Sequence, residues 1–588
     1  MRHRFIPQPR RVAPKPLAMA GLALATTTLA LTACGGGDSP SLPTLSAATP
    51  GTLQSCTDLA AKAVLPNTTI ASATLVATGA LAVTGAAAPV PEHCLVKGEM
   101  NRRTSAVDGK SYAIGFEMRL PTAWNGRFYY QANGGIDGTV VTATGPTSGG
   151  APTSNALTMG FAVISSDAGH TGPPWWALDP QARLDYGYQA VGSLTPMAKN
   201  LIKAAYGKAP DRSYIGGCSN GGRHAMIAAA RYGDQYDGVL AGAPGFHLPK
   251  AAIAQLWKVQ QYASIAPAKV ATGADTGQPD ISSAVTAAEF KLLAARITAK
   301  CDALDGATDG IVSDIQVCQS TFNLKSDVPS CTGARDGSCL TDAQKTVLAN
   351  IFAGAKNSRG DALYSEFYFD PGVGGSNTLV WHYNNSTALD PGAVAFIFTS
   401  PPSTQAAFLA TTGLKYGLAF NVDTDYPKIF ATDATYKESP WSYMTPPDET
   451  NLSTLKGRGG KLLVWHGAAD PIFSAADTSR WYDGLQKANL GQAAEFARYF
   501  MVPGMNHCSG GPATDQFDAL SSLVNWVEKG EAPEQLVARA RGTGANVVNA
   551  ELPSGWSAGR TRPLCAYPKV ARYNGTGDLE AAASFTCR

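Results

Sequence analysis

Residues 213–223 read Ser-Tyr-Ile-Gly-Gly-Cys-Ser-Asn-Gly-Gly-Arg and constrain the fold more than any other stretch of the chain. A short β-branched and aromatic run passes there directly into a helix-forming run that ends at Arg231. Ser219 lies at the junction between Gly217 and Gly221, a Gly-x-Ser-x-Gly pattern found where a strand turns sharply into a helix. Glycines are needed because the neighbouring chain approaches such a turn closely. We expect Ser219 to be a nucleophile, and the alternative is a glycine-rich turn with an incidental serine.

Strand-like and helix-like segments alternate around this turn. The strands are expected near residues 112–120, 128–131, 161–166 and 239–244, and a helix near 186–206. This alternation predicts a mostly parallel sheet with helices on both faces. The pattern breaks after Pro244. From roughly 246 to 450 the chain mixes helical pieces, cysteine-rich loops and irregular aromatic stretches, which we interpret as an inserted lid.

Two later loops supply the other groups that a serine nucleophile needs. The apolar run 461–467 ends just before Asp470, and a second expected strand, 496–502, is followed by His507. The order serine, acid, histidine is the one that the α/β-hydrolase fold uses. We expect His507 to be the general base and Asp470 to orient it. His466 is the rival base, but it precedes the acid at the end of a strand, so we expect it to line the pocket.

The same chemistry needs donors for the oxyanion. In this fold one backbone N–H follows the nucleophile, here Asn220, and another comes from the loop after an early strand. That loop offers Gly134 and Gly135, and the sequence does not choose between them. Phe473, just after the acid, is expected to line an aromatic pocket. The reaction predicted is ester hydrolysis through an acyl-enzyme; a peptidase on the same fold and a non-catalytic surface binding lipoprotein are the alternatives.

The composition and the N-terminus indicate which partners the protein lacks and whether it is exported. The 588 residues are 16% charged with a net charge of +2, and the body of the chain has no basic run, so no nucleic-acid partner is expected. A basic N-terminus and a short apolar stretch, 17–31, predict a signal peptide rather than a membrane span. It ends in Leu-Thr-Ala-Cys34-Gly, which resembles a bacterial lipobox with a lipidated Cys34. Cleavage nearby with an incidental cysteine is the alternative.

The expected organisation follows from these segments. It comprises a lipoprotein-type signal peptide at 1–33, a flexible tether at 34–54, the hydrolase core at 55–245, the lid at 246–450 and the second part of the core at 451–588. The tether is predicted from its Gly, Ser, Pro and Thr content. The protein is expected to be exported, either as an outer-membrane or periplasmic lipoprotein attached through Cys34 or in secreted form.

The cysteines predict disulfides. The chain has 11 cysteines, so ten remain beside Cys34, and an even number in an exported chain favours disulfide pairing over metal binding. The sequence does not fix the connectivity, but three local pairs and one near the N-terminus are plausible: Cys301–Cys318, Cys331–Cys339, Cys565–Cys587 and Cys56–Cys94. Cys218 and Cys508 are left, beside the nucleophile and the base. We predict that they bond and tie those two loops together.

A candidate metal site lies within the lid. Asp302, Asp305 and Asp309 crowd one turn-rich loop, and hard oxygen ligands of this kind suit Ca²⁺. The spacing is not that of an EF-hand. A solvated Asp-Gly turn is the alternative.

Four stretches carry a family resemblance: Gly217–Arg223, Tyr236–Pro244, Val502–Gly511 and Arg560–Pro568. With them the chain resembles the tannase and feruloyl esterase family over roughly residues 55–588. The resemblance implies all five disulfides, a structural Ca²⁺ site completed by the carbonyls of Ala307 and Ile311, and no organic cofactor. It implies small substrates that are esters of aromatic carboxylic acids, such as hydroxycinnamates and gallates, with Phe398 in the lid lining the pocket.

An esterase of the mono(2-hydroxyethyl) terephthalate hydrolase type is a narrower alternative within this resemblance. Such an enzyme holds the free carboxylate of its substrate with a lid arginine. The matching stretch here, Tyr383–Pro391, contains no arginine. Asn220 also stands where that enzyme is expected to have an acid. Both departures favour the broader feruloyl-esterase-like activity.

Overall fold

The computed structural model describes residues 42–146, 150 and 153–588. The predicted signal peptide, Cys34 and the start of the predicted tether lie outside the described residues. Among the residues described, no helix combines the length and the apolar character that crossing a membrane requires.

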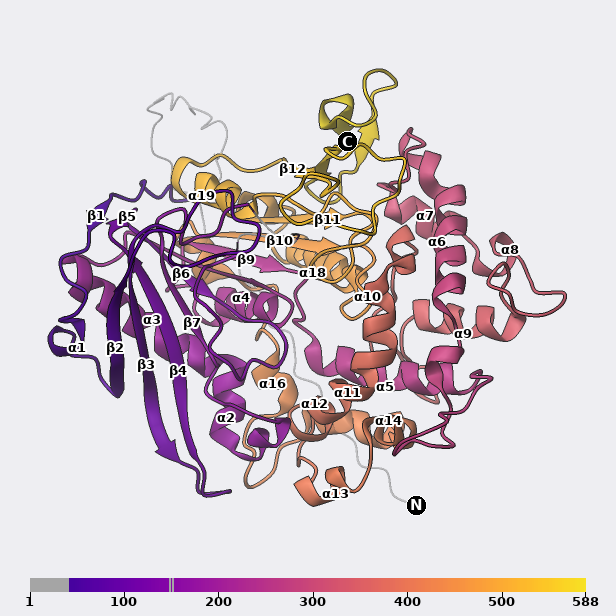
Figure 1. Ribbon diagram of the computed structural model, residues 1–588, viewed down its shortest axis with the longest axis horizontal. Helices are drawn as coiled ribbons and strands as arrows, with labels where there is room; N and C mark the ends of the chain where they lie inside the picture. Colours follow the sequence, from indigo (N-terminus) through magenta and orange to yellow (C-terminus); the bar gives the residue numbers. More distant parts are fainter. Residues whose placement is uncertain (1–41, 147–149, 151–152) are drawn as a thin grey trace, which may run out of the picture. The chain divides into compact units, whose positions relative to one another are not determined.

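A nine-stranded sheet organises the described chain (Figure 1). Its strand order is β11-β10-β9-β8-β6-β7-β4-β3-β2. Six neighbouring strands in this order, β11, β10, β9, β8, β6 and β7, pair in parallel. Strands β4, β3 and β2 continue the sheet beyond β7 with antiparallel pairing. The bounds are β2 Thr68–Val76, β3 His93–Thr104, β4 Ser111–Pro121, β6 Arg127–Gln131, β7 Ala162–Ser166, β8 Arg212–Cys218, β9 Gly238–Gly242, β10 Lys461–Gly467 and β11 Ala497–Val502. The predicted α/β fold with a mostly parallel sheet is confirmed.

Both faces of the parallel part are buried. Successive strand residues point to opposite faces, so Leu462 and Val464 of β10 join one apolar core while Leu463 and Trp465 join the other. The first core contains residues of α3 (Ala190–Tyr206) and α4 (Asn220–Arg231), and the second contains residues of α19 (Ala519–Lys529). Because the strands are parallel, their carboxyl ends meet at one edge of the sheet, where α/β proteins place their sites.

The structure differs from the expected tether over residues 42–54. β1 (Gly51–Thr52) pairs antiparallel with β5 (Ala123–Trp124), and the backbone N–H of Thr49 donates to Asp211 at 2.8 Å. Leu42 and Leu45 pack against the apolar cores. These residues are part of the folded core because their apolar side chains and backbone groups find partners on it.

The segment between β9 and β10 is an insertion of helices and loops. In the described part of the chain it adds no strand to the sheet. Its α-helices are α5 Leu248–Ala263, α6 Ala287–Cys301, α7 Ile315–Thr321, α8 Leu324–Asp327, α9 Asp342–Phe352, α10 Ser376–Leu379, α11 Ser386–Ala388, α12 Asp390–Phe396, α13 Gln405–Leu409, α14 Gly413–Ala419, α15 Val422–Asp425, α16 Pro440–Met444 and α17 Ser453–Gly457. In Figure 1, helices α5 to α14 gather on the side away from β2, β3 and β4.

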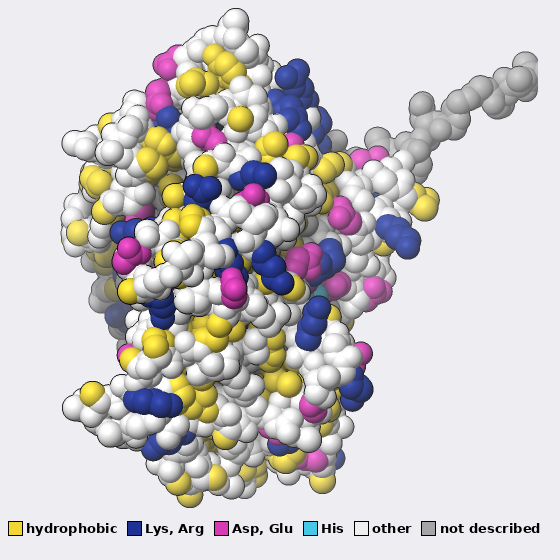
Figure 2. All heavy atoms as spheres, turned by 90° about the vertical axis from the view of Figure 1, so that its right-hand side faces the viewer, with side chains coloured by type: hydrophobic (Ala, Val, Ile, Leu, Met, Phe, Trp, Pro, Cys, Tyr) yellow, Lys and Arg dark blue, Asp and Glu magenta, His cyan; other side chains and the backbone are white. Residues whose placement is uncertain are grey.

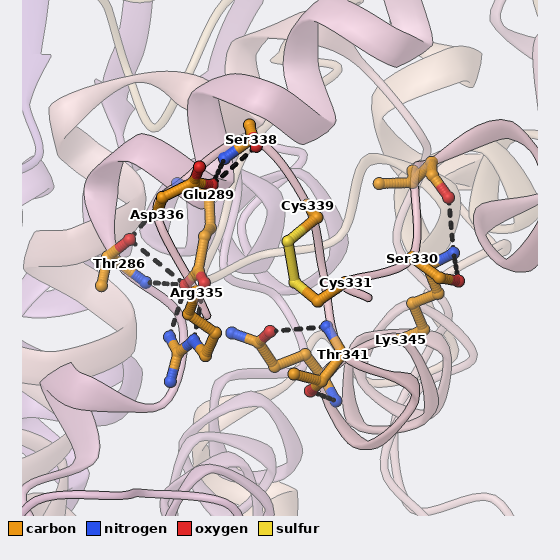
Figure 3. Close-up of a disulfide and its surroundings, with 12 residues drawn as sticks. Thr286, Glu289, Ser330, Cys331, Arg335, Asp336, Ser338, Cys339, Thr341 and Lys345 are labelled. Atoms are coloured by element: carbon orange, nitrogen blue, oxygen red, sulfur yellow. Dashed lines mark hydrogen bonds and ion pairs between the residues drawn. A yellow bond between two sulfur atoms is a disulfide. The ribbon is translucent and has the colours of Figure 1, made fainter. Parts of the chain in front are cut away.

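Short-range contacts hold the insertion together where its helices are sparse. Figure 3 shows the Cys331–Cys339 disulfide beside the ion pair of Arg335 with Glu289. Thr286 and Thr341 cap α6 and α9 through capping boxes, so the N-cap and N3 backbone N–H groups of each helix have acceptors. Caps, an ion pair and a disulfide thus join α6, α9 and the loop between them.

The chain ends in two small antiparallel sheets that pack on the insertion. They pair β12 (Gln535–Arg539) with β13 (Thr561–Cys565), and β14 (Ala571–Tyr573) with β15 (Phe585–Cys587). Arg562 pairs with Asp309, and Arg572 donates to the carbonyl of Leu304 at 3.1 Å. These contacts join the C-terminal segment to the aspartate-rich loop.

Figure 2 shows the face of the molecule that lies to the right in Figure 1. Lysine and arginine side chains on it are interspersed with aspartate and glutamate and with apolar groups. This distribution agrees with the near-neutral net charge of the chain.

Candidate active site

Ser219 occupies a strained turn between β8 and α4. Its φ is 68° and its ψ is −126°, a backbone conformation that non-glycine residues rarely adopt. A Cβ on Gly217 or Gly221 would lie 2.2 or 2.3 Å from the carbonyl oxygen of Ala132, so only glycine fits at either position. The two glycines of the Gly-x-Ser-x-Gly pattern are therefore needed for the predicted reason: the loop after β6 approaches the turn too closely for a side chain.

Three loops at the carboxyl ends of β8, β10 and β11 bring Ser219, Asp470 and His507 together. Nε2 of His507 lies 2.8 Å from Oγ of Ser219, and Nδ1 lies 2.6 Å from Oδ2 of Asp470. The side chain of Asp470 is fully buried, whereas Ser219 is half-buried and His507 retains 9% exposure. The serine–histidine–acid chain expected from the sequence is therefore assembled in hydrogen-bonding geometry.

Asp470 is held as a carboxylate by four donors. Its Oδ1 accepts the backbone N–H groups of Ile472 and Phe473 at 2.9 Å each, and Oδ2 faces both His507 and His466. Burial alone would raise the pKa of Asp470, but the charge of His507 and the hydrogen bonds of both histidines lower it well below its usual range.

The expected pocket position of His466 is wrong. The side chain is 0% exposed and lies behind the acid. Its Nε2 is 3.2 Å from Oδ2 of Asp470, and its Nδ1 is 2.9 Å from Oγ1 of Thr478. Both ring nitrogens are engaged away from Ser219, because the strand that carries His466 ends beneath the Asp470 loop. Its spacing of four residues from Asp470 is the signal that sequence reasoning missed.

The loop after β6 brings candidate oxyanion donors to the nucleophile. A Cβ placed on Gly134 would lie 3.8 Å from Cβ of Ser219, whereas one on Gly135 would meet no atom within 4 Å. Within the described residues, the backbone N–H groups of Gly134, Gly135 and Asn220 donate no hydrogen bond to another protein group. Gly134 is thus the glycine next to Ser219, which the sequence left open.

Aromatic rings flank the histidine. The rings of Phe473 and Trp381 lie 5.3 and 5.1 Å from the His507 ring, both edge to face. Phe473 lies beside the base, and its expected place in a substrate pocket stays a prediction. Trp381 is not expected from the sequence, because the insertion has no regular pattern that points to the site. Phe398 is buried after α12, and in the described chain its ring contacts neither His507 nor Phe473.

All five predicted disulfides are confirmed: Cys56–Cys94, Cys218–Cys508, Cys301–Cys318, Cys331–Cys339 and Cys565–Cys587. The bond between Cys218 and Cys508 joins the residues beside Ser219 and His507, which are far apart in sequence. Five disulfides in one chain are a property of exported proteins.

The aspartate-rich loop has calcium-type donors but no assembled cage. Asp302 and Asp305 are buried, and burial raises the pKa of both carboxyl groups, that of Asp305 to about 6. Of the three aspartates, Arg562 forms an ion pair with Asp309 alone. Their oxygens accept loop N–H groups, as Asp302 does from Gly310 at 3.0 Å. Over the described residues, no three His, Cys, Asp or Glu side chains converge as metal ligands would.

The parallel sheet, the strained serine and the hydrogen-bonded Ser219–His507–Asp470 chain together define a serine hydrolase of the α/β-hydrolase class. The family model for tannase and feruloyl esterase matches residues 94–588. The chain belongs to the tannase and feruloyl esterase family and is a carboxylic ester hydrolase.

Individual relatives agree with this membership. The chain is 39% identical to mono(2-hydroxyethyl) terephthalate hydrolase of Piscinibacter sakaiensis, over 86% of this chain and 87% of that protein. It is 28% identical to a probable feruloyl esterase B-2 of Aspergillus fumigatus, over 84% and 87% of the two chains. The crystal structure of feruloyl esterase B from Aspergillus oryzae matches with a TM-score of 0.70 at 24% identity, covering 91% of this chain and 99% of that one. The structural match establishes the shared fold.

Proposed function

We propose that the protein hydrolyses esters of aromatic carboxylic acids, of the feruloyl or tannin type, through an acyl-enzyme on Ser219. The observation that carries this proposal is the continuous hydrogen-bonded chain from Ser219 Oγ through His507 to Asp470. His507 takes the serine proton as Oγ attacks the ester carbonyl, and then gives it to the leaving alcohol. Water, deprotonated by the same histidine, releases the acid.

The oxyanion would be held by the N–H groups of Asn220 and Gly134. Both are free of other protein acceptors in the described chain, and Gly134 lies against Ser219. Preorganised N–H donors of this kind stabilise the charge that develops on the carbonyl oxygen. Asp470 keeps the imidazole oriented and stabilises its protonated form.

Two observations support an aromatic acyl group. The rings of Phe473 and Trp381 lie beside His507, nearly perpendicular to its imidazole, and aromatic side chains of this kind favour contact with an aromatic substrate. The relatives include probable feruloyl esterases. We therefore infer a substrate whose aromatic acid packs beside these rings.

A terephthalate monoester is the second candidate substrate. The relative that shares 39% of its residues over most of both chains is a mono(2-hydroxyethyl) terephthalate hydrolase, and this favours the candidate. The absence of arginine from Tyr383–Pro391 disfavours it, since a free carboxylate needs a cationic partner. We expect weaker turnover of this substrate than of neutral ferulate esters.

The panel experiment compares methyl ferulate, methyl gallate, mono(2-hydroxyethyl) terephthalate and a ferulate amide, with Ser219→Ala as the control. We expect turnover of the aromatic esters, none of the amide, and loss of all activity in the variant. Equal turnover of the amide would indicate a peptidase. Turnover of terephthalate monoester above ferulate would establish the second candidate.

We also propose that the aspartate-rich loop binds Ca²⁺ structurally, through the side chains of Asp302, Asp305 and Asp309 and the carbonyls of Ala307 and Ile311. Three buried carboxylates against one arginine support it, because burial of uncompensated charge is costly. Calcium should raise Tm and EDTA should lower it, with no response in Asp305→Asn. An unchanged Tm across both treatments would contradict the site.

The cellular form is proposed from the N-terminus. A lipobox-like sequence ending at Cys34 supports a lipoprotein held at a membrane surface by acyl chains. Mass spectrometry of the mature N-terminus tests this. A Cys34 that carries acyl chains is expected, whereas an unmodified N-terminus near that residue would indicate a freely secreted protein.

A further inference from the structure

A buried polar network joins the two loops that carry the candidate oxyanion donors. Nδ2 of Asn220 donates to Oδ2 of Asp137 at 2.8 Å and lies 3.2 Å from the carbonyl of Asn133. Nε2 of His224 lies 2.9 Å from the same Asp137 oxygen. Asn220 and His224 belong to the first turns of α4, whereas Asn133 and Asp137 belong to the loop after β6.

Asp137 is at the centre of this network. Its side chain is 2% exposed, and its backbone adopts a φ of 52°. Its N–H donates to the carbonyl of Gly134 at 3.3 Å, so the residue also closes the turn that contains Gly134. One residue therefore contacts both the Gly134 turn and the side chain of Asn220.

The remaining groups of the network hold Asn220 in one orientation. Nε of Arg223 donates to Oδ1 of Asn220 at 2.7 Å, and the other guanidinium nitrogens donate to the carbonyls of Gly187 and Tyr186. Burial and the Arg223 charge lower the pKa of His224. Its Nε2 lies between the Asp137 carboxylate, at 2.9 Å, and a guanidinium nitrogen of Arg223, at 3.1 Å. Asp137 is thus the group that both α4 side chains contact.

Oxyanion donors are effective only when they are fixed before the charge develops. Gly134 lies in the loop after β6 and Asn220 begins α4, and the side-chain contacts described above span the gap between them. We propose that Asp137 is a positioning residue for the ester hydrolysis: it clamps the Gly134 turn to Asn220 and so sets the geometry of the oxyanion hole. This inference rests on the proposed function, and it adds a residue whose described hydrogen bonds reach none of Ser219, His507 and Asp470.

The test compares Asp137→Ala and Asp137→Asn with a matched control, Asp237→Ala. Asp237 is also a buried carboxylate beside β8, but it accepts the N–H of Ser213 at the opposite end of that strand. Removing the clamp should lower kcat by roughly tenfold to a hundredfold with KM little changed, because misplaced donors weaken the transition state selectively. Asp137→Asn keeps an acceptor oxygen, so its loss should be smaller, and the control should keep wild-type kcat.

A second readout separates positioning from folding. Phenylboronic acid adds to a serine Oγ and forms a tetrahedral, negatively charged boron, while the serine proton passes to the histidine. Its affinity should fall in Asp137→Ala by about the factor lost from kcat, whereas affinity for free ferulate should stay unchanged. If Asp137→Ala does not fold, the same comparison is made with Asp137→Asn: its kcat, its boronate affinity and its ferulate affinity are each divided by the wild-type value.

Other outcomes overturn the inference. Wild-type kcat in the folded Asp137 variants, an equal kcat loss in Asp237→Ala, or parallel loss of boronate and ferulate affinity would each do so. Failure of the proposed function looks different, because the wild-type protein would then show no Ser219-dependent turnover at all.

Discussion

At the scale of single residues, Asp470 organises two histidines rather than one. His507 connects it to Ser219, and His466 supports it from behind. A carboxylate with four donors is fixed in orientation, and its charge favours protonation of the neighbouring imidazole during catalysis. The same geometry settles which histidine can act as the base, since only His507 reaches the serine among the described residues.

Substitution of the two histidines should have unequal effects. His507→Ala should lower kcat by a factor on the order of 10³ or more, since it removes the base. His466→Ala should cost only about tenfold, because Asp470 keeps its other three donors. Steady-state kinetics on one aromatic ester measures both. Equal losses in the two variants would contradict the division of roles.

At the scale of elements, the bond between Cys218 and Cys508 ties the β8–α4 turn to the loop after β11. It closes a sequence separation of 290 residues, against 8 for Cys331–Cys339. In the chain-entropy account such loops correspond to about 6 and about 2.5 kcal/mol of stabilisation. The longer bond also fixes the distance between nucleophile and base.

Removal of each bond by paired alanines should therefore separate stability from catalysis. The Cys218→Ala/Cys508→Ala protein should have a lower Tm and a kcat lowered about tenfold, because His507 is then less firmly positioned. The Cys331→Ala/Cys339→Ala protein should keep wild-type kcat with a smaller Tm loss. Thermal scans and kinetics on both check this, and unchanged kcat in the first variant would count against a positioning role.

His247 joins the two ends of the insertion to the core. It lies just before α5, and its ring nitrogens contact Asp477 of α18 (Ala475–Ala488) at 2.8 Å and Glu449 at 2.9 Å. The ring also stacks on Trp441, against which Lys250 packs from α5. Burial alone would lower the pKa of His247, but the two carboxylates raise it from 6.5 to about 9.

This pair of contacts predicts a pH-dependent stability. A raised folded-state pKa stabilises the protein fully below pH 6.5, and the contribution is lost as pH rises through about 9. This contribution to the free energy of unfolding is on the order of 3 kcal/mol. Tm should fall by a few degrees between pH 6.5 and 9.5, and His247→Gln should flatten that fall. A wild-type profile matching that of the variant would refute the assignment.

At the scale of the whole molecule, sequence reasoning predicted the parts that obey local rules. Gly217, Ser219 and Gly221 determine a turn that only one backbone geometry satisfies, and the strands before Asp470 and His507 are continuous apolar runs. The order of the three catalytic candidates then predicts the fold. Residues 42–54 depart from the expected tether, because a stretch rich in small polar residues resembles a linker even where it packs on the core.

The remaining parts depend on contacts between distant segments. Trp381 reaches His507 from an irregular segment of the insertion, and Asp137 reaches Asn220 across 83 residues. No periodicity or spacing in the sequence records such pairings. For His466 the sequence shows half of the answer. It lies four residues before Asp470, but the sequence does not show that its side chain points toward that carboxylate.

Covalent trapping of the acyl-enzyme tests the central claim most directly. The protein is quenched in acid during turnover of p-nitrophenyl ferulate and digested, and the mass of each serine-containing peptide is measured. One feruloyl group per chain is predicted on the peptide that contains Ser219, with none in Ser219→Ala. An acyl group on another residue, or full turnover by the variant, would contradict the account.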